Sequence, residues 1–213
     1  MTTQRKRTGG KRPKQGCDCL RETPASYGPC LVRFDWVIKR LLRHKADFGV
    51  VSGFLTTLLG RRVTILRVLE GESNARSRDD RVNRVDVLAE DKDGARYIIE
   101  VQTTTEVDFF HRMAYGASKA LTESIKKGEK YGVIKKVFSV NIVYFTFGQG
   151  KDYVYRGVTE FRGLHTHDVL KLSDTQMKKF GIGEVSDIFP EYFVLRVNEF
   201  DGVAKTPLDE WIY

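Results

Sequence analysis

The chain has 213 residues, of which 41% are hydrophobic and 30% charged, enough for one sizeable core with appendages. No apolar run approaches the roughly 20 residues that a membrane helix needs, and the basic N terminus is followed by no apolar stretch typical of a secretory signal. These features exclude a membrane-spanning class and predict a cytoplasmic protein without membrane partners.

Residues 1–30 are rich in Lys, Arg, Gly, Pro and Thr, and we expect a disordered basic segment. The formal net charge is +8, and six positive charges precede the first acidic residue. Such a tail either contacts nucleic-acid phosphates or only keeps a disordered segment soluble, and the charge alone does not decide between these functions. Residues 31–213 are expected to form the folded domain.

The first elements of that domain are predicted to be two helices and a strand. Apolar residues recur at helical spacing over residues 34–42, which include Asp35, and a second short helix covers residues 50–59. A β-rich run follows over residues 63–69. Next comes a polar, solvated loop over residues 72–81, which carries Arg76, Arg78 and Arg81.

Two further strands are predicted at residues 82–90 and 95–102, joined by Asp-Lys-Asp-Gly. This sequence suits a three-residue hairpin loop that Gly94 closes in the left-handed region. Asp91 then pairs with Ala95, and counting back along both strands places Asp86 directly opposite Glu100. Because side chains alternate along a strand, these two carboxylates share a face, and the apolar residues of the other face belong in the core.

Two carboxylates in directly opposed positions repel each other and destabilise a sheet. Three arrangements would relieve the repulsion: a divalent cation between them, an ion pair with Arg84, or protonation of one carboxylate. On the hairpin alone, a surface hairpin with a charged face and Arg84 as counter-ion is the favoured interpretation, and a register slip of one residue would move Asp86 to the opposite face. The hairpin by itself therefore does not establish a metal site.

A helix is predicted over residues 107–127, followed by an apolar, β-branched strand over 136–146 and a further short strand over 153–161. The stripe of that helix expected to face the core consists of Phe110, Met113, Ala114, Ala117 and Leu121. Arg112 and Lys119 fall near the opposite, polar side, where they are either ordinary solvated charges or neighbours of the carboxylate hairpin.

The spacing of Asp86 and Glu100-Val101-Gln102 resembles the D…E-x-K signature of PD-(D/E)XK nucleases. A closer resemblance is to the Rpn-type recombination-promoting nucleases and transposases, whose short motifs occur in the same order over residues 34–213. These motifs are Phe34-Asp35-x-x-Ile38-Lys39, Val85-Asp86-Val87, Ile99-Glu100-Val101-Gln102, Phe110-x-Arg112, Tyr115 with Lys119, Lys127-Gly128-x-x-Tyr131, Phe189-Pro190-Glu191-Tyr192 and Leu208-Asp209-Glu210-Trp211.

The resemblance implies an α/β, restriction-endonuclease-like core in the order helix, three strands, helix, strand, with a mixed central sheet. It also implies a metal-dependent DNA endonuclease associated with transposition or recombination, with Mg²⁺ or Mn²⁺ as cofactor. Asp86 and Glu100 would be metal ligands together with the Val101 carbonyl, and Asp35 would be an outer acid. The loop arginines Arg76, Arg78 and Arg81 would hold backbone phosphates.

The chain departs from the family pattern at the catalytic lysine, which is Gln102 here. A glutamine can orient water but carries no charge, so we expect Arg112 or Lys119 to supply the missing cation. Relatives carry a further helical tail after the Asp209-Glu210-Trp211 motif, so the resemblance also implies a shortened C terminus. Both departures favour the alternative, a catalytically inactive DNA-binding or interaction module that retains the nuclease fold.

Overall fold

The structure, a computed structural model, describes residues 48–69, 86–200 and 202–212. The expected basic segment, the first predicted helix and the arginine-bearing loop lie outside these ranges. Several predicted functional residues lie outside them as well, namely Asp35, Arg76, Arg78, Arg81 and Arg84.

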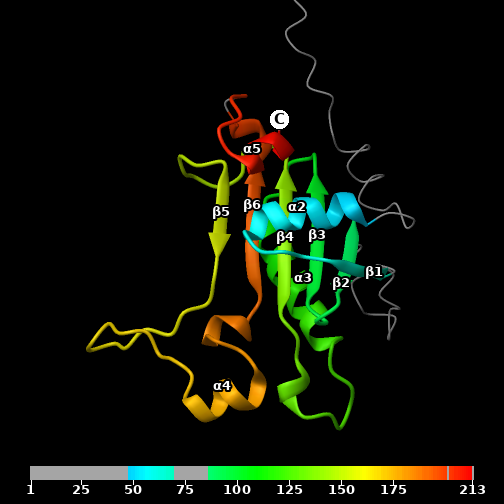
Figure 1. Cartoon of the computed structure of the whole chain (residues 1–213). Helices are drawn as coiled ribbons and strands as arrows, with labels where there is room; N and C mark the ends of the chain where they lie inside the picture. Colours follow the sequence, from blue (N-terminus) through cyan, green and yellow to red (C-terminus); the bar gives the residue numbers. More distant parts are fainter. Residues whose placement is uncertain (1–47, 70–85, 201, 213) are drawn as a thin grey trace, which may run out of the picture. The chain divides into compact units, whose positions relative to one another are not determined.

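The described chain forms a six-stranded sheet in the order β1-β2-β3-β4-β6-β5 (Figure 1). The strands are β1 (Ile65–Leu69), β2 (Val87–Asp91), β3 (Arg96–Gln102), β4 (Val137–Val143), β5 (Val154–Gly157) and β6 (Glu191–Arg196). The β3–β4 and β4–β6 pairs are parallel and the other three are antiparallel, so the sheet is mixed. This confirms the α/β, restriction-endonuclease-like fold class that the sequence predicts.

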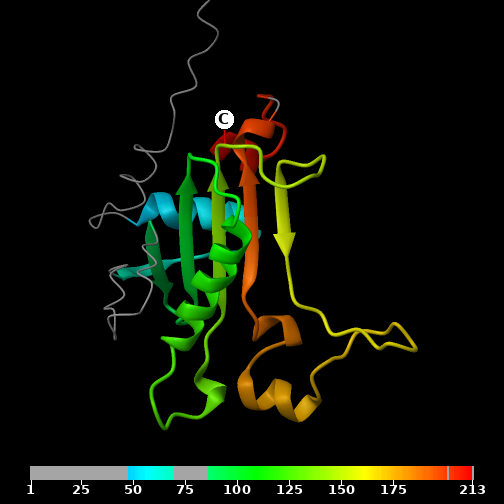
Figure 2. The same cartoon turned by 180° about the vertical axis from the view of Figure 1, so that it is seen from behind.

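Helices cover both faces of this sheet. Within the described ranges the α-helices are α2 (Gly49–Leu59), α3 (Phe109–Thr122), α4 (Asp174–Phe180) and α5 (Pro207–Ile212), and short 3-10 turns cover Tyr131–Val133, Val185–Asp187 and Val197–Glu199. The two views show α2 crossing one face and α3 lying along the other (Figures 1 and 2). No helix within the described ranges is both long enough and apolar enough to cross a membrane.

The β2–β3 hairpin has the predicted turn and register. Gly94 adopts a φ of 82°, and its N–H donates to the Asp91 carbonyl at 3.1 Å. The Asp91 carboxylate accepts the N–H groups of Asp93 and Ala95, both at 2.9 Å, which fixes the loop locally. The register runs from Val87 opposite Ile99 to Glu90 opposite Arg96, as the turn chemistry requires. A one-residue slip is therefore excluded.

The face of β3 that carries Glu100 is buried, contrary to the expectation that it lies outside the core. Ile98 and Glu100 are only 3% and 4% exposed. The cause is tertiary: β3 lies inside the sheet, with α2 over Tyr97, Ile99 and Val101 on one face and α3 over Ile98 on the other. A strand that is covered on both faces does not follow the alternation of a half-exposed strand.

The predicted core stripe of α3 is wrong in part, because Phe110 is 56% exposed and Ala114 is also exposed. The buried residues of the helix are Phe109, Met113, Gly116, Ala117 and Ala120. Three of these have small or absent side chains, so the helix can approach the sheet closely along that line. A stripe that starts from Phe110 omits Phe109, Gly116 and Ala120 and therefore rotates the helix away from its contact face.

Three elements near the C terminus were not predicted: α4, α5 and β6. The most consequential is β6, which pairs in parallel with β4 and in antiparallel with β5 and thus extends the sheet beyond its predicted strands. Helix α5 packs on α2, where the rings of Trp211 and Phe54 lie 5.8 Å apart between centroids. Residues from the end of the chain thereby complete the core on the α2 face.

Candidate active site

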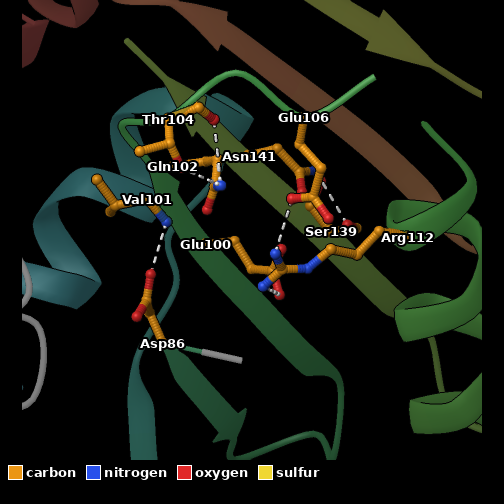
Figure 3. A network of polar contacts seen from close by, with 9 residues as sticks. All are labelled: Asp86, Glu100, Val101, Gln102, Thr104, Glu106, Arg112, Ser139 and Asn141. Carbon is orange, nitrogen blue, oxygen red and sulfur yellow. Dashed lines mark hydrogen bonds and ion pairs between the residues drawn. The ribbon is translucent and has the colours of Figure 1, made fainter. Parts of the chain in front are cut away.

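Asp86 directly precedes β2 and lies beside β3. The carboxylate oxygen Oδ2 of Asp86 accepts the backbone N–H of Val101 at 2.9 Å (Figure 3). The regular pairing of β2 and β3 ends at Val87 and Ile99, directly after Asp86. The negative charge of Asp86 acts on the Glu100 carboxylate, so the two acids are neighbours at this end of the hairpin.

Glu100 is buried and only partly paired. The residue is 4% exposed, and Oε1 lies 3.4 Å from the Nη2 atom of Arg112, which is a long ion pair. The second oxygen, Oε2, is buried and has no hydrogen-bond partner among the residues that the structure describes. Arg84, considered from the sequence as a counter-ion, lies outside the described ranges, and the cation that contacts Glu100 comes from α3.

Burial raises the pKa of Glu100 above its ordinary value. The Arg112 guanidinium opposes this shift, while the negative charge of Asp86 adds to it. The balance is upward because the single long ion pair does not compensate for the lost hydration. Glu100 is thus a carboxylate whose charged form is poorly stabilised by the described protein groups, which is the condition under which a bound cation contributes most.

Arg112 occupies the first turn of α3 and is shared between two acids. Its Nη1 atom lies 2.9 Å from an oxygen of Glu106, shorter than the 3.4 Å to Glu100. Lys119 lies seven residues later on the same helix, about 10 Å further along its axis. Its ammonium stands 6.0 Å from the centre of the Tyr115 ring. The fold therefore brings Arg112 into contact with Glu100.

Gln102 ends β3 and is half-buried. Its amide nitrogen donates to the carbonyl and the hydroxyl oxygen of Thr104, at 3.2 Å and 3.1 Å. These bonds hold the side chain against the loop that follows the strand. The amide therefore has a defined orientation at the end of β3, without supplying the positive charge of a lysine.

Asn141 is a residue near this site that the sequence analysis did not single out. It lies on β4 directly beside Glu100, is 1% exposed, and its oxygen Oδ1 is buried without a hydrogen-bond partner in the described part of the chain. A signal for it exists in the sequence, because Asn141 and Ser139 interrupt an otherwise apolar, β-branched strand. A buried amide needs partners, so such an interruption marks a local polar requirement.

The donor set fits a divalent cation of the Mg²⁺ type. Mg²⁺ is commonly held by one or two carboxylates together with waters and substrate phosphate, and Asp86 with the unpartnered Oε2 of Glu100 offers that set. A site built wholly from side chains would need more ligands, and the described ranges hold no group of three or more His, Cys, Asp and Glu residues suited to a metal. The open positions would be left for water and substrate.

The model of the PD-(D/E)XK nuclease family transposases matches residues 32–178 of the chain. The chain belongs to this family. The match includes the carboxylate hairpin, α3 and β4, so every element that forms the candidate site lies within it. No curated protein and no solved structure matches the chain. Membership indicates a nuclease-type function related to transposition.

Proposed function

We propose that this family transposase hydrolyses DNA phosphodiester bonds as a Mg²⁺- or Mn²⁺-dependent endonuclease, with Asp86 and Glu100 as its metal ligands. The observation that carries the proposal is the unpartnered, buried carboxylate oxygen of Glu100 next to a second carboxylate. Removing an ionised carboxylate from water without compensation is costly, and a perturbed acid in such a setting is a candidate functional group. A divalent cation would offset that cost.

The residues of the chain have distinct roles in this proposal. The Val101 N–H orients the Asp86 carboxylate, and the Val101 carbonyl is a further candidate ligand. Gln102, oriented by Thr104, would position water at the phosphorus. When bound, the cation would lower the pKa of a coordinated water and neutralise charge on the phosphate.

A cationic side chain of α3 would supply the positive charge that the family lysine provides in relatives. Arg112 already contacts Glu100 and is partly exposed, so its remaining N–H groups can reach a phosphate oxygen. Lys119 remains a second candidate from the same helix. Asp35 as an outer acid, and Arg76, Arg78 and Arg81 as phosphate contacts, belong to the same proposal.

The alternative function is a DNA-binding or interaction module that keeps the fold without cleaving. The feature that favours it is Gln102, since its amide nitrogen is committed to Thr104 and it carries no charge. The two functions differ in one measurable property, because only the nuclease needs both carboxylates and the cation for turnover.

The test is incubation of supercoiled plasmid with the full chain, with Mg²⁺, with Mn²⁺ and with chelator. Wild type should nick the plasmid only with metal, and Asp86→Asn and Glu100→Gln should not nick it. Glu90→Gln is the matched control, because Glu90 is a carboxylate of the same hairpin that pairs instead with Arg67 at 2.8 Å. Plasmid binding without metal-dependent cleavage would overturn the nuclease proposal in favour of the alternative. A parallel RNA substrate shows which nucleic acid is cut.

A further inference from the structure

Asn141 occupies an unusual position for an amide, in the middle of a strand that is buried along its whole length. Its side chain lies on the same face of the sheet as that of Glu100, because residues paired in a parallel ladder project to the same side. Figure 3 draws both residues with the Arg112 network. The amide therefore borders the carboxylate site from the neighbouring strand.

The orientation of this amide is fixed by the bonds of its nitrogen. Nδ2 donates to the Ser139 carbonyl at 3.1 Å, to the Ser139 hydroxyl oxygen at 3.0 Å and to the Phe193 carbonyl at 3.1 Å. Two of these partners are backbone acceptors, so exchanging the amide oxygen and nitrogen would set Oδ1 against carbonyl oxygens. Oδ1 must therefore point away from them.

The result is two neighbouring, buried oxygen acceptors without donors among the described residues: Oδ1 of Asn141 and Oε2 of Glu100. Two acceptors cannot satisfy each other, and a buried polar atom left unpaired lowers stability. A cation, with any water that it carries, interacts favourably with both oxygens at once. An amide oxygen also adds a ligand without adding a third negative charge.

We propose that Asn141 contributes Oδ1 as an oxygen donor to the divalent-cation site, directly or through one cation-bound water. This inference rests on the proposed function, since it needs the cation site at Asp86 and Glu100. The hydrogen bond from Asn141 to the Phe193 carbonyl links the site to β6. The parallel strands β3, β4 and β6 together would therefore set the position of the cation. Asn141 is in this sense a metal-site residue and not only a link between strands.

A purely structural role for Asn141 makes different predictions, and two substitutions separate the roles. Asn141→Leu keeps the approximate shape but removes Oδ1 as well as the nitrogen bonds. Ser139→Ala removes one acceptor of Nδ2 and leaves Oδ1 in place. If Asn141 only links strands, both variants lose stability and neither changes metal affinity.

The experiment is a Mn²⁺ titration of the full chain without DNA, in which electron paramagnetic resonance measures the concentration of free Mn²⁺. Asn141→Leu should bind Mn²⁺ about tenfold more weakly than wild type, and Ser139→Ala should bind within about twofold. Equal affinity of a folded Asn141→Leu variant would overturn the inference. Asp86→Asn should lose binding in any case, and failure of wild type itself to bind Mn²⁺ would overturn the proposed metal site, so the two failures are distinguishable.

A second measurement uses wild type and does not depend on the folding of a variant. In protein labelled with ¹³C-asparagine, titration with Mg²⁺ should shift the side-chain carbonyl of Asn141, saturating at the same concentration as Mg²⁺ binding. Asn198, whose amide nitrogen donates to the Tyr144 carbonyl, is the internal control and should not shift. A stationary Asn141 signal during saturable Mg²⁺ binding would overturn the inference.

Discussion

Two buried glutamates on the same sheet differ in how they are paired. Glu191, at the start of β6, is 6% exposed, and its two oxygens lie 3.1 Å from the Lys136 ammonium and 2.6 Å from the Arg156 Nε atom. Glu100, on β3, is 4% exposed, yet it has one contact of 3.4 Å with Arg112 and one oxygen without a hydrogen-bond partner in the described ranges.

The difference lies in what the neighbouring elements supply. Cationic side chains adjoining β4 and on β5 surround Glu191, so its charge is compensated inside the protein. Glu100 faces a buried amide and an arginine that is closer to Glu106. A paired buried acid is explained by structure alone, whereas an under-paired buried acid is a candidate position for a bound ligand.

The largest expected difference is in cleavage. Glu100→Gln should lower the rate of plasmid nicking by about a hundredfold or more, since a metal ligand is lost where charge develops in the transition state. Glu191→Gln should nick within a few-fold of wild type. Comparable losses in both variants, at temperatures where both are folded, would show that burial and not pairing explains the effect.

Metal should also stabilise the variants of the two glutamates unequally. With Mn²⁺ at about one hundred times its dissociation constant, wild type and Glu191→Gln should each gain about 2.7 kcal/mol in the free energy of unfolding, because the ion binds the folded state. Glu100→Gln and Asp86→Asn should gain little. Denaturant melts with and without Mn²⁺ measure this gain, and an equal gain in all four proteins would place the cation elsewhere.

Without metal, Glu191→Gln should be the less stable of the two glutamate variants. Glu191→Gln should cost about 1–3 kcal/mol, because Lys136 loses its charged partner in a mostly buried setting. Glu100→Gln should be no less stable than wild type, because it removes a charge that the surroundings stabilise poorly. Urea melts in chelator give both values, and a strongly destabilised Glu100→Gln would contradict the under-paired description.

The raised pKa of Glu100 predicts a pH dependence in the metal-free protein. The folded state holds this proton more tightly than the unfolded chain, whose glutamates titrate near about 4.3. Stability therefore falls as the pH rises from that value through the raised pKa, and the loss is complete above it. The difference between wild-type and Glu100→Gln melts across pH should show this fall, whereas a flat difference would mean that the pKa is unshifted.

The smallest expected effects concern the cations of α3. Arg112→Ala should lower nicking about tenfold or more, because Arg112 contacts Glu100. Lys119→Ala should lower nicking by a few-fold and affect DNA binding less, since its ammonium lies further along the helix. Single-turnover rates at saturating DNA separate the two. A larger loss in Lys119→Ala would identify Lys119 as the substitute for the family lysine.

Local sequence determined the hairpin and its register. Asp91 and Gly94 specify the turn through bonds within five residues, and the turn fixes which residues lie opposite each other on the strands. The same reasoning predicted α2, β3 and β4, because each of these elements has a periodic or apolar signal of its own. The family motif Ile99-Glu100-Val101-Gln102 lies on β3, and Phe110-x-Arg112 lies on α3, which is why the fold class was predictable.

The tertiary structure decided what surrounds Glu100. Its burial, its contact with Arg112 and its neighbour Asn141 all depend on how α3 and β4 pack on β3, across separations of 12 residues or more. The strand β6, which anchors Asn141, gave no signal strong enough to predict. The alternation of residues along one strand indicates only which side chains share a face. Compensation of a buried charge depends on other strands and helices, which come together only in the folded structure.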